Sequence, residues 1–246
     1  MKNNLFIIGL FLIGDLFLVK AQRYLPEQIG FQLSLGAIDE FKLFHKEDHK
    51  GGSLNLFEFH LYSGVYWHTM ERNKWGTGFQ FTRKRLEQEP KQSEFYAVDQ
   101  YIIDASYWSM LFSNKKKNFF FGLGVGVNIG YEWSYRNMLF ELNYNDLLES
   151  EKNKFAAKGS DEDCRKQKFY EMKNIHLGTK GEDKKEELVK IKNRFLYGAL
   201  VGAEAEVFLA NQFALLFNTK LRYLRKSFTN DFQFNYGVGF KYILNY

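Results

Sequence analysis

Large apolar residues alternate with glycine and polar residues along the stretch FFFGLGVGVNIGYEW, residues 119–133. The odd positions carry Phe, Leu, Val, Ile, Tyr and Trp, whereas the even positions from Gly122 onward carry glycine, asparagine or glutamate. Side chains of a β-strand point alternately to its two faces, so one face here is apolar and the other is small or polar. The pattern predicts a strand and leaves open which face contacts a core and which contacts its surroundings.

Seven further segments show the same two-residue period, so we predict eight β-strands in all. The last segment is the most regular, because bulky apolar residues occupy every second position from Phe232 to Tyr246. The predicted strands are residues 29–38, 54–67, 75–85, 95–112, 119–133, 194–208, 212–224 and 232–246.

The predicted connections alternate in length along the chain. HTMERNK, SNKKKN and LAN are short, whereas residues 39–53, 86–94, 134–193 and 225–231 form longer links. Short turns and both termini on one side, with long loops on the other, are typical of outer-membrane barrels. We therefore predict an all-β fold, an eight-stranded antiparallel transmembrane β-barrel of the outer-membrane type.

The glycine-rich face decides which side is inside. A soluble barrel would turn its bulky apolar residues inward and needs a polar outer surface, which glycines cannot supply. The narrow interior of an eight-stranded barrel suits small and polar side chains and has no room for a channel. The apolar face is therefore expected to contact lipid, and passage of DNA through the barrel is excluded by size.

Acids and bases on the inner face form the candidate structural site. An unpaired charge in that interior would cost several kcal/mol, so these groups are expected to pair across the lumen. We expect an ion-pair plug, with a substrate path or a proton relay as the alternative. The predicted network consists of Glu58, Glu132, Glu204, Glu206, Lys220, Arg222 and Lys241, with the glutamates at 204 and 206 facing the three bases. The other polar residues predicted inside are Gln32, Ser34, His60, Asp104, Asn128 and Asn218.

Aromatic residues near strand ends are expected to form girdles at the membrane surfaces. The predicted girdle residues are Tyr66, Trp67, Trp75, Trp108 and Trp133. The alternating C-terminus is expected to act as the assembly signal, and its residues are Phe240, Tyr242, Leu244 and Tyr246.

The N-terminus carries the features of a secretory signal. Lys2 precedes an apolar stretch that ends at VKAQ, so residues 1–21 are predicted to be a signal peptide cleaved after Ala21. A membrane anchor is the alternative, although an uninterrupted span needs about 20 apolar residues. Residues 22–246 are then a single barrel domain.

The link over residues 134–193 is too long and too charged for a simple hairpin. Acid–base pairs at four-residue spacing in KKEELVKIK predict some helix there. We expect a solvated, partly disordered extracellular insertion, with a small packed unit as the alternative. The net charge of +5 is not gathered on one face, so direct nucleic-acid binding is not expected.

No catalytic or cofactor motif stands out. GLGVGVNIG lacks the spacing and the following helix of a nucleotide-binding motif. His45 and His49 have metal-ligand spacing but no third ligand, and His60 and Ser63 point to opposite faces of one strand. The single Cys164 cannot form an internal disulfide. We expect neither an enzyme nor a bound cofactor or metal.

Several stretches resemble the TraO family of conjugative-transposon proteins of the Bacteroidetes. These are AQRYLPEQIGFQLSLGAIDEF, FFFGLGVGVNIGYEW, FLYGALVGAEAEVFLANQFALLFNTKLRYLR and FQFNYGVGFKYILN. Glu204, Glu206 and Arg222 stand where the family has acids and an arginine. The long charged insertion departs from the family pattern, in which this link is much shorter.

The resemblance implies an outer-membrane component encoded with a conjugative DNA-transfer apparatus related to type IV secretion. The expected partners are outer-membrane lipid, other conjugal transfer proteins and the recipient-cell surface. A free-standing surface protein, such as an adhesin or a defence barrel, is the alternative function. A lipid-modifying barrel enzyme is the third. Neighbouring transfer genes would favour the first over the second.

Overall fold

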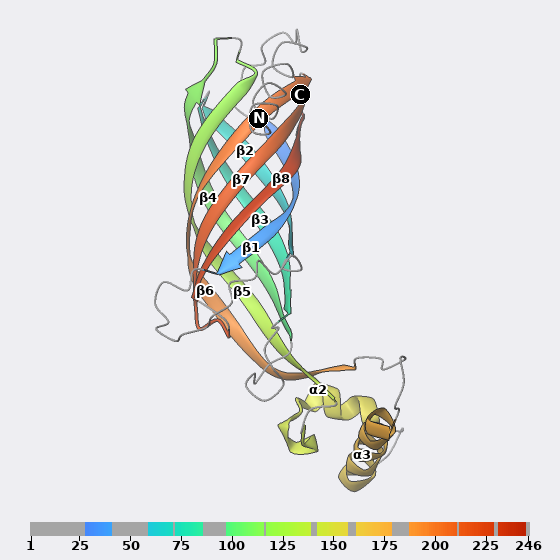
Figure 1. The fold of residues 1–246 in the computed structure, drawn as a ribbon. Coiled ribbons are helices and arrows are strands. Elements are labelled where there is room, and N and C mark those ends of the chain that lie inside the picture. The colour runs from blue at the N-terminus through green and yellow to red at the C-terminus, as the bar shows by residue number, and fades with distance from the viewer. Residues whose placement is uncertain are drawn as a thin grey trace, which may run out of the picture.

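Eight antiparallel strands follow one another around a closed barrel in chain order, and β1 closes the ring by pairing with β8 (Figure 1). The computed structural model describes residues 28–40, 59–70, 72–85, 97–115, 117–138, 142–156, 161–178, 187–210, 212–228 and 231–244. The strands are β1 (Ile29–Glu40), β2 (Phe59–Met70), β3 (Asn73–Arg85), β4 (Ala97–Ser113), β5 (Phe119–Asn137), β6 (Leu188–Ala210), β7 (Phe213–Arg225) and β8 (Phe232–Leu244).

The predicted eight-stranded barrel is confirmed, and the observed strands fall on the alternating segments. The largest difference is at β5 and β6, which continue past the predicted ends at residues 133 and 194. Tyr135 pairs with Lys190 and Asn137 with Leu188, so the insertion begins after β5 at residue 138 and ends at residue 187. The predicted ends were wrong because charged residues at these positions interrupt the apolar period without interrupting the backbone pairing.

The two faces of the barrel have the polarity expected in lipid. Outward residues are bulky, apolar and exposed, for example Val127 at 61% and Leu35 at 58% of full exposure. Inward residues include many charged and amide side chains that are fully buried, such as Arg222 and Lys241 at 0%. Because a soluble protein exposes polar groups and buries apolar ones, this arrangement shows a transmembrane barrel of the outer-membrane type.

The two ends of the barrel differ in their connections. The termini of the described barrel, Ile29 and Leu244, pair with each other at the end that carries the short turns between β2 and β3, β4 and β5, and β6 and β7. We call this the short-turn end and the opposite one the loop end. In barrels of this type the short turns face the periplasm and the longer loops face the outside.

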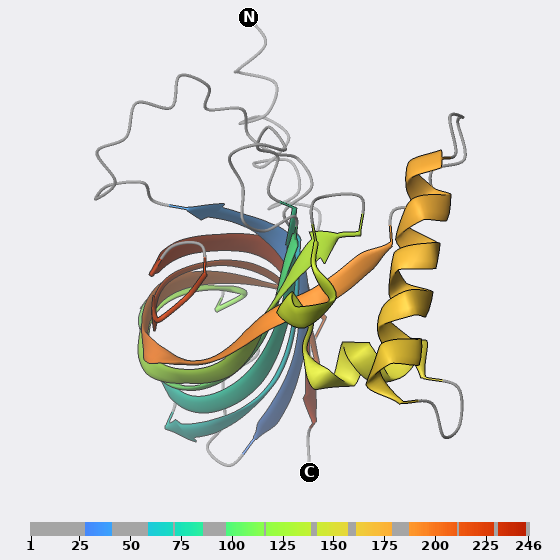
Figure 2. The ribbon, with the colours of Figure 1, turned by 90° about the horizontal axis from the view of Figure 1, so that it is seen from below.

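The insertion between β5 and β6 contains a folded unit, which we call the helical module (residues 142–156 and 161–178). Its elements are η1 (Tyr144–Asp146), α2 (Glu149–Lys152), η2 (Asn153–Phe155) and α3 (Glu162–Gly178). Figures 1 and 2 show the module beyond the loop end and to one side of the barrel, at the tip of the extended β5–β6 hairpin. The alternative of a packed unit therefore describes these residues better than the expected disorder.

The helical module has a small apolar core of its own. Phe169 of α3 is fully buried against Tyr144 and Phe155, with ring centroids 5.9 and 5.3 Å apart. Met138, directly after β5, and residues of β6 complete the cluster, so the hairpin holds the module in place. The core residues are Met138, Leu142, Tyr144, Leu147, Phe155, Phe169, Val189 and Ile191.

The insertion contains helix, as predicted, but in α2 and α3; the described part of the stretch that suggested it, residues 187–192, forms none. β6 already begins at Leu188, and Val189 and Ile191 are buried in the cluster of the helical module. The apolar contacts of these two residues outweigh the acid–base spacing that favoured a helix.

No helix in the described ranges has both the length and the hydropathy needed to cross a membrane. The predicted signal peptide, residues 1–21, lies outside the described residues, as do Glu58, Tyr246 and the His45–His49 pair.

Candidate functional site

Three large aromatic side chains fill much of the barrel interior, or lumen. Tyr62, Tyr66 and Trp108 are each at most 2% exposed. Glycines on the neighbouring strands make room for them: Gly76 is level with Tyr66, and Gly124 is level with Trp108. On the glycine-rich face of β5, Gly124 therefore leaves the space that the buried Trp108 indole ring occupies.

Two predicted girdle positions were wrong. Tyr66 and Trp108 lie at inward positions of β2 and β4 and are fully buried. Trp67 and Trp75 are exposed on the outer face, at 44% and 54%, near the short-turn end. Proximity to a strand end suggested a girdle for all of them, but the two-residue period decides the face.

Gly124→Ala is expected to destabilise the barrel by about 1–3 kcal/mol, because a Cβ at this position would overlap the rigid Trp108 indole. Gly122→Ala is the matched control on the same strand, since the atom nearest its added Cβ belongs to the flexible Met110 side chain, with the Ser109 carbonyl oxygen next at 3.0 Å. Urea unfolding in lipid vesicles, followed by tryptophan fluorescence, measures both. Equal stability of the two variants would contradict the role assigned to Gly124.

A first ion cluster lies in the half of the lumen nearer the short turns. Lys74 Nζ contacts Glu204 and lies 2.7 Å from Glu206 Oε1. Lys241 Nζ donates to the same Glu206 oxygen at 3.0 Å. All four side chains are at most 1% exposed or fully buried. The Lys74 ammonium also lies 4.6 Å from the centroid of the Tyr66 ring, which provides a further favourable contact for a buried cation.

A second ion cluster is centred on Asp104 of β4. Arg222 Nη2 donates to Asp104 Oδ2 at 2.6 Å, and Lys220 Nζ lies 3.3 Å from the same oxygen. The Tyr62 hydroxyl donates to Asp104 Oδ1 at 3.1 Å. Arg222 Nη1 donates to Asn128 Oδ1 at 2.5 Å. The Asp104 carboxylate thus binds two cations of β7 and a phenol of β2.

The predicted network is therefore divided into two parts. The structure brings Glu204, Glu206 and Lys241 together, but Arg222 pairs with Asp104 and not with either glutamate. The reason is the register: Arg222 is level with Leu200 on β6, which displaces it along the barrel from Glu204.

Lys74 is the main residue that sequence reasoning missed. It was assigned to a turn because the predicted strand began at residue 75, whereas β3 begins at Asn73. Its even number places it on the same face as Gly76 and Gln80, so extending the strand by one inward position would have found it. Asp104 was predicted inside, among the charged groups expected to pair, but not as a member of the core network.

Glu132 lies on the loop-end side of the lumen and accepts hydrogen bonds from neutral groups. Gln100 Nε2 and Ser227 Oγ each donate to Oε1 at 3.1 Å, and the Phe228 backbone N–H donates to Oε2 at 2.9 Å. Ser227 and Phe228 belong to the β7–β8 connection, so the Glu132 carboxylate holds that connection over the opening at the loop end of the barrel.

The other end of the lumen is closed by apolar side chains. They come from β4 to β8, and the Phe120 and Phe208 rings meet edge to face with centroids 5.6 Å apart. The members of this apolar plug are Met110, Phe120, Phe208, Ala214 and Ile243. From the short-turn end to the loop end, the lumen thus contains the apolar plug, the two ion clusters and the β7–β8 connection bound by Glu132. Together these side chains pack the interior.

The remaining predicted site residues fall on both faces. Phe240 and Tyr242 of the expected assembly signal are exposed on the outside at 50% and 44%, and Leu244 is half-buried. The other predicted interior residues are buried in the lumen: Gln32, Ser34, His60, Asn128 and Asn218. Among the described residues, no group of acids, histidines and cysteine has the arrangement of a metal site.

The helical module presents a mixed-charge surface outside the membrane. The Lys152 ammonium donates a hydrogen bond to Glu149 at 2.8 Å and holds the pKa of that carboxyl below its usual value. Lys154 pairs with the buried Glu151 at 2.6 Å, and Lys166 with Glu162 at 3.3 Å. Acids and bases compensate each other locally, so the module has no strongly basic face among its described residues.

The family model for conjugative transposon protein TraO matches residues 25–141 and 186–244. The chain belongs to the TraO family. The match covers the barrel strands and omits residues 142–185, which contain the helical module. This TraO family member therefore carries an addition between β5 and β6 that the family model does not include, as the resemblance implied.

Solved structures with likeness to this TraO family member are small barrels. Ail, the attachment invasion locus protein of Yersinia pestis, has 9% identity and a TM-score of 0.44 over 89% of this chain and 100% of its own. Neisserial surface protein A has 8% identity and a TM-score of 0.45 over 87% and 95% of the two chains. The N-terminal β-barrel domain of Pseudomonas aeruginosa OprF has 7% identity and a TM-score of 0.43 over 89% and 98%. No curated protein sequence matches the chain significantly.

Proposed function

We propose that this TraO family member is an outer-membrane component of a conjugative transposon's DNA-transfer apparatus, with an anchoring and interaction role. The observation that carries the proposal is the family match over all eight strands. The packed lumen supports a role without DNA passage, because its ion clusters and apolar plug leave no open path. In this role the barrel is a rigid, non-catalytic anchor.

Its contacts with other transfer proteins, or with the recipient cell, would be made by parts outside the lipid. The helical module is the largest described part there (Figure 2). Its own apolar core and its attachment to the β5–β6 hairpin make it a defined surface that moves with the barrel.

Replacing residues 142–185 with a short Gly-Ser linker tests the interaction role. The barrel is expected to fold, because all eight strands and both ion clusters are kept, and it should retain heat-dependent mobility in gels. Transfer frequency from donor cells is expected to fall toward that of a strain without the gene. Transfer at the level of the unaltered protein would contradict a role for the module.

Deleting the whole gene tests the proposal itself. A normal transfer frequency in the deletion strain would overturn the assignment to the apparatus. Crosslinking through the exposed Cys164 of α3 in donor cells is then the direct way to capture neighbours of the module.

A further inference from the structure

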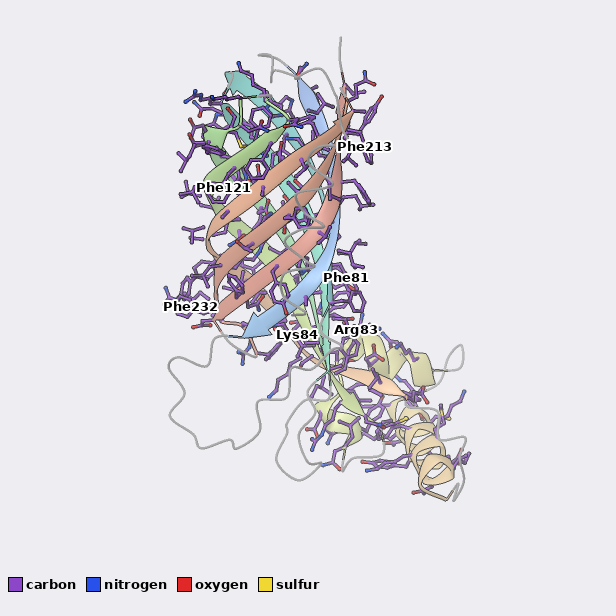
Figure 3. The ribbon with its side chains drawn as sticks, turned by 45° about the horizontal axis from the view of Figure 1, so that its top comes forward. Phe81, Arg83, Lys84, Phe121, Phe213 and Phe232 are labelled. Carbon is purple, nitrogen blue, oxygen red and sulfur yellow. The ribbon has the colours of Figure 1, made fainter. Side chains whose placement is uncertain are left out.

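The outer face of the barrel changes from aliphatic to aromatic toward the loop end. On β5, the exposed Val125, Val127 and Ile129 are followed by Tyr131 and Trp133. The outward run is about as long as a tilted strand needs to cross the apolar layer of a bilayer, ~10 residues. Figure 3 shows Phe121 and Phe213 toward the short-turn end, and Phe81, Arg83 and Phe232 toward the loop end.

The aromatic residues at this level form a continuous band across β3 to β6. The Phe81 and Tyr101 rings lie 5.2 Å apart, and the Tyr101 and Trp133 rings lie 5.4 Å apart. Tyr131 is level with Phe195, which stacks on Tyr197 at 6.5 Å. We call this set the outer aromatic band: Phe81, Tyr101, Tyr131, Trp133, Phe195 and Tyr197.

Two cationic side chains sit on rings of this band. Lys190 Nζ lies 3.4 Å from the ring centroid of Trp133. The Arg225 guanidinium lies 5.8 Å from the ring centroid of Tyr197, its neighbour across the β6–β7 pair. On β7 this arginine occupies the outward position directly after Tyr223, where the apolar run ends.

These two cations differ from Arg83 of β3, which lies at the same level. Arg83 is already compensated, because its Nε and Nη2 atoms each lie 2.7 Å from the Asp99 carboxylate. Among the described residues, Lys190 and Arg225 have a ring contact but no carboxylate within ion-pair distance. Ring contacts leave most N–H donors of a cation free to bind an anion.

The anions found at this depth are phosphate groups of lipid headgroups. Lysine and arginine at the edge of an apolar layer extend their charged ends toward the headgroups, where they form charge-assisted hydrogen bonds with phosphate oxygens. We propose that Lys190 and Arg225 bind phosphate groups on outer-leaflet lipids, with the outer aromatic band packing against the lipid beneath. The headgroups would then fix the height and rotation of the β5–β7 side, from which the helical module projects.

Native mass spectrometry of the barrel in maltoside micelles tests this proposal. The probes are bis-phosphorylated lipid A, the same lipid with its phosphates removed, and inorganic phosphate. The unaltered protein is expected to retain phosphorylated lipid A at least about ten-fold more tightly than Lys190→Gln/Arg225→Gln does. Lys190→Arg/Arg225→Lys is expected to keep the binding.

Arg72→Gln/Lys115→Gln is the matched control, because it removes two exposed charges at the short-turn end. It should bind phosphorylated lipid A like the unaltered protein. Equal retention by the Lys190/Arg225 variant, or equal retention of the dephosphorylated lipid, would overturn the proposal. Displacement of the lipid by millimolar inorganic phosphate would show a general anion site and would overturn the assignment to lipid. Heat-dependent gel mobility verifies that each variant is folded.

Discussion

Asp104→Asn is expected to lower the free energy of unfolding of the barrel by about 3–5 kcal/mol, the usual cost of removing one partner from a buried ion pair. The variant keeps the volume of the side chain but leaves Arg222 and Lys220 without their shared carboxylate. Both cations are inside the lumen, where water cannot replace the lost partner. Urea unfolding in lipid vesicles, followed by the fluorescence of the outer tryptophans, measures the change.

Asp99→Asn on the same strand is the matched control. Asp99 also binds an arginine, but the Arg83 side chain is 46% exposed and its charge stays solvated without the partner. The expected loss is about 1.5–3 kcal/mol, the usual contribution of hydrogen bonds to a charged group, because the Asp99 carboxylate itself is buried. Adding Arg222→Met to Asp104→Asn should restore part of the stability. If the two single aspartate variants were equally stable, the inward and outward assignment of β4 would be wrong.

Lys74→Met is expected to lower the free energy of unfolding by a similar amount, about 3–5 kcal/mol. The substitution removes the cation that pairs with Glu204 and leaves Lys241 as the remaining cation beside Glu206. Two buried carboxylates on the same face of β6 then share one cation. The midpoint of urea unfolding should fall accordingly.

Lys74→Met/Glu204→Gln provides the internal check on this prediction. Neutralising the glutamate removes the uncompensated charge, so the double variant should be clearly more stable than Lys74→Met alone. Lys115→Met in the exposed β4–β5 turn should leave the unfolding midpoint unchanged. A double variant no more stable than the single one would show that Lys74 acts through packing against Tyr66 and not through charge.

Alternation alone predicted the strands and the face of almost every residue on them. The period of two is a property of the backbone, so it placed Asp104, Glu206 and Arg222 inside without knowledge of any partner. Tyr66 and Trp108 were misplaced only because proximity to a strand end was given more weight than the period. In a small membrane barrel the outer face contacts lipid and the inner face lines a narrow lumen, so the alternation of apolar and polar residues reports directly on which face each residue occupies.

Partners within the lumen were harder to predict. Strand tilt and stagger decide which inward residues of distant strands meet across a barrel. Asp104 and Arg222 lie on β4 and β7, so neither adjacency in sequence nor direct strand pairing links them. The helical module was given only as the alternative, for a different reason. Its apolar core combines residues of short helices, Phe169 of α3 and strand positions at its base, and none of these segments shows a clear amphipathic period in the sequence.

Because β1 pairs with β8, the barrel can close only after the last strand has been synthesised. Hydrogen bonds along the seam join the first and last strands, so the ring cannot close without β8. A sheet that lacked β8 would keep two unpaired edges, which are prone to aggregation. A nonsense mutation upstream of β8 should therefore yield protein that the periplasm degrades, and never a shortened but functional barrel.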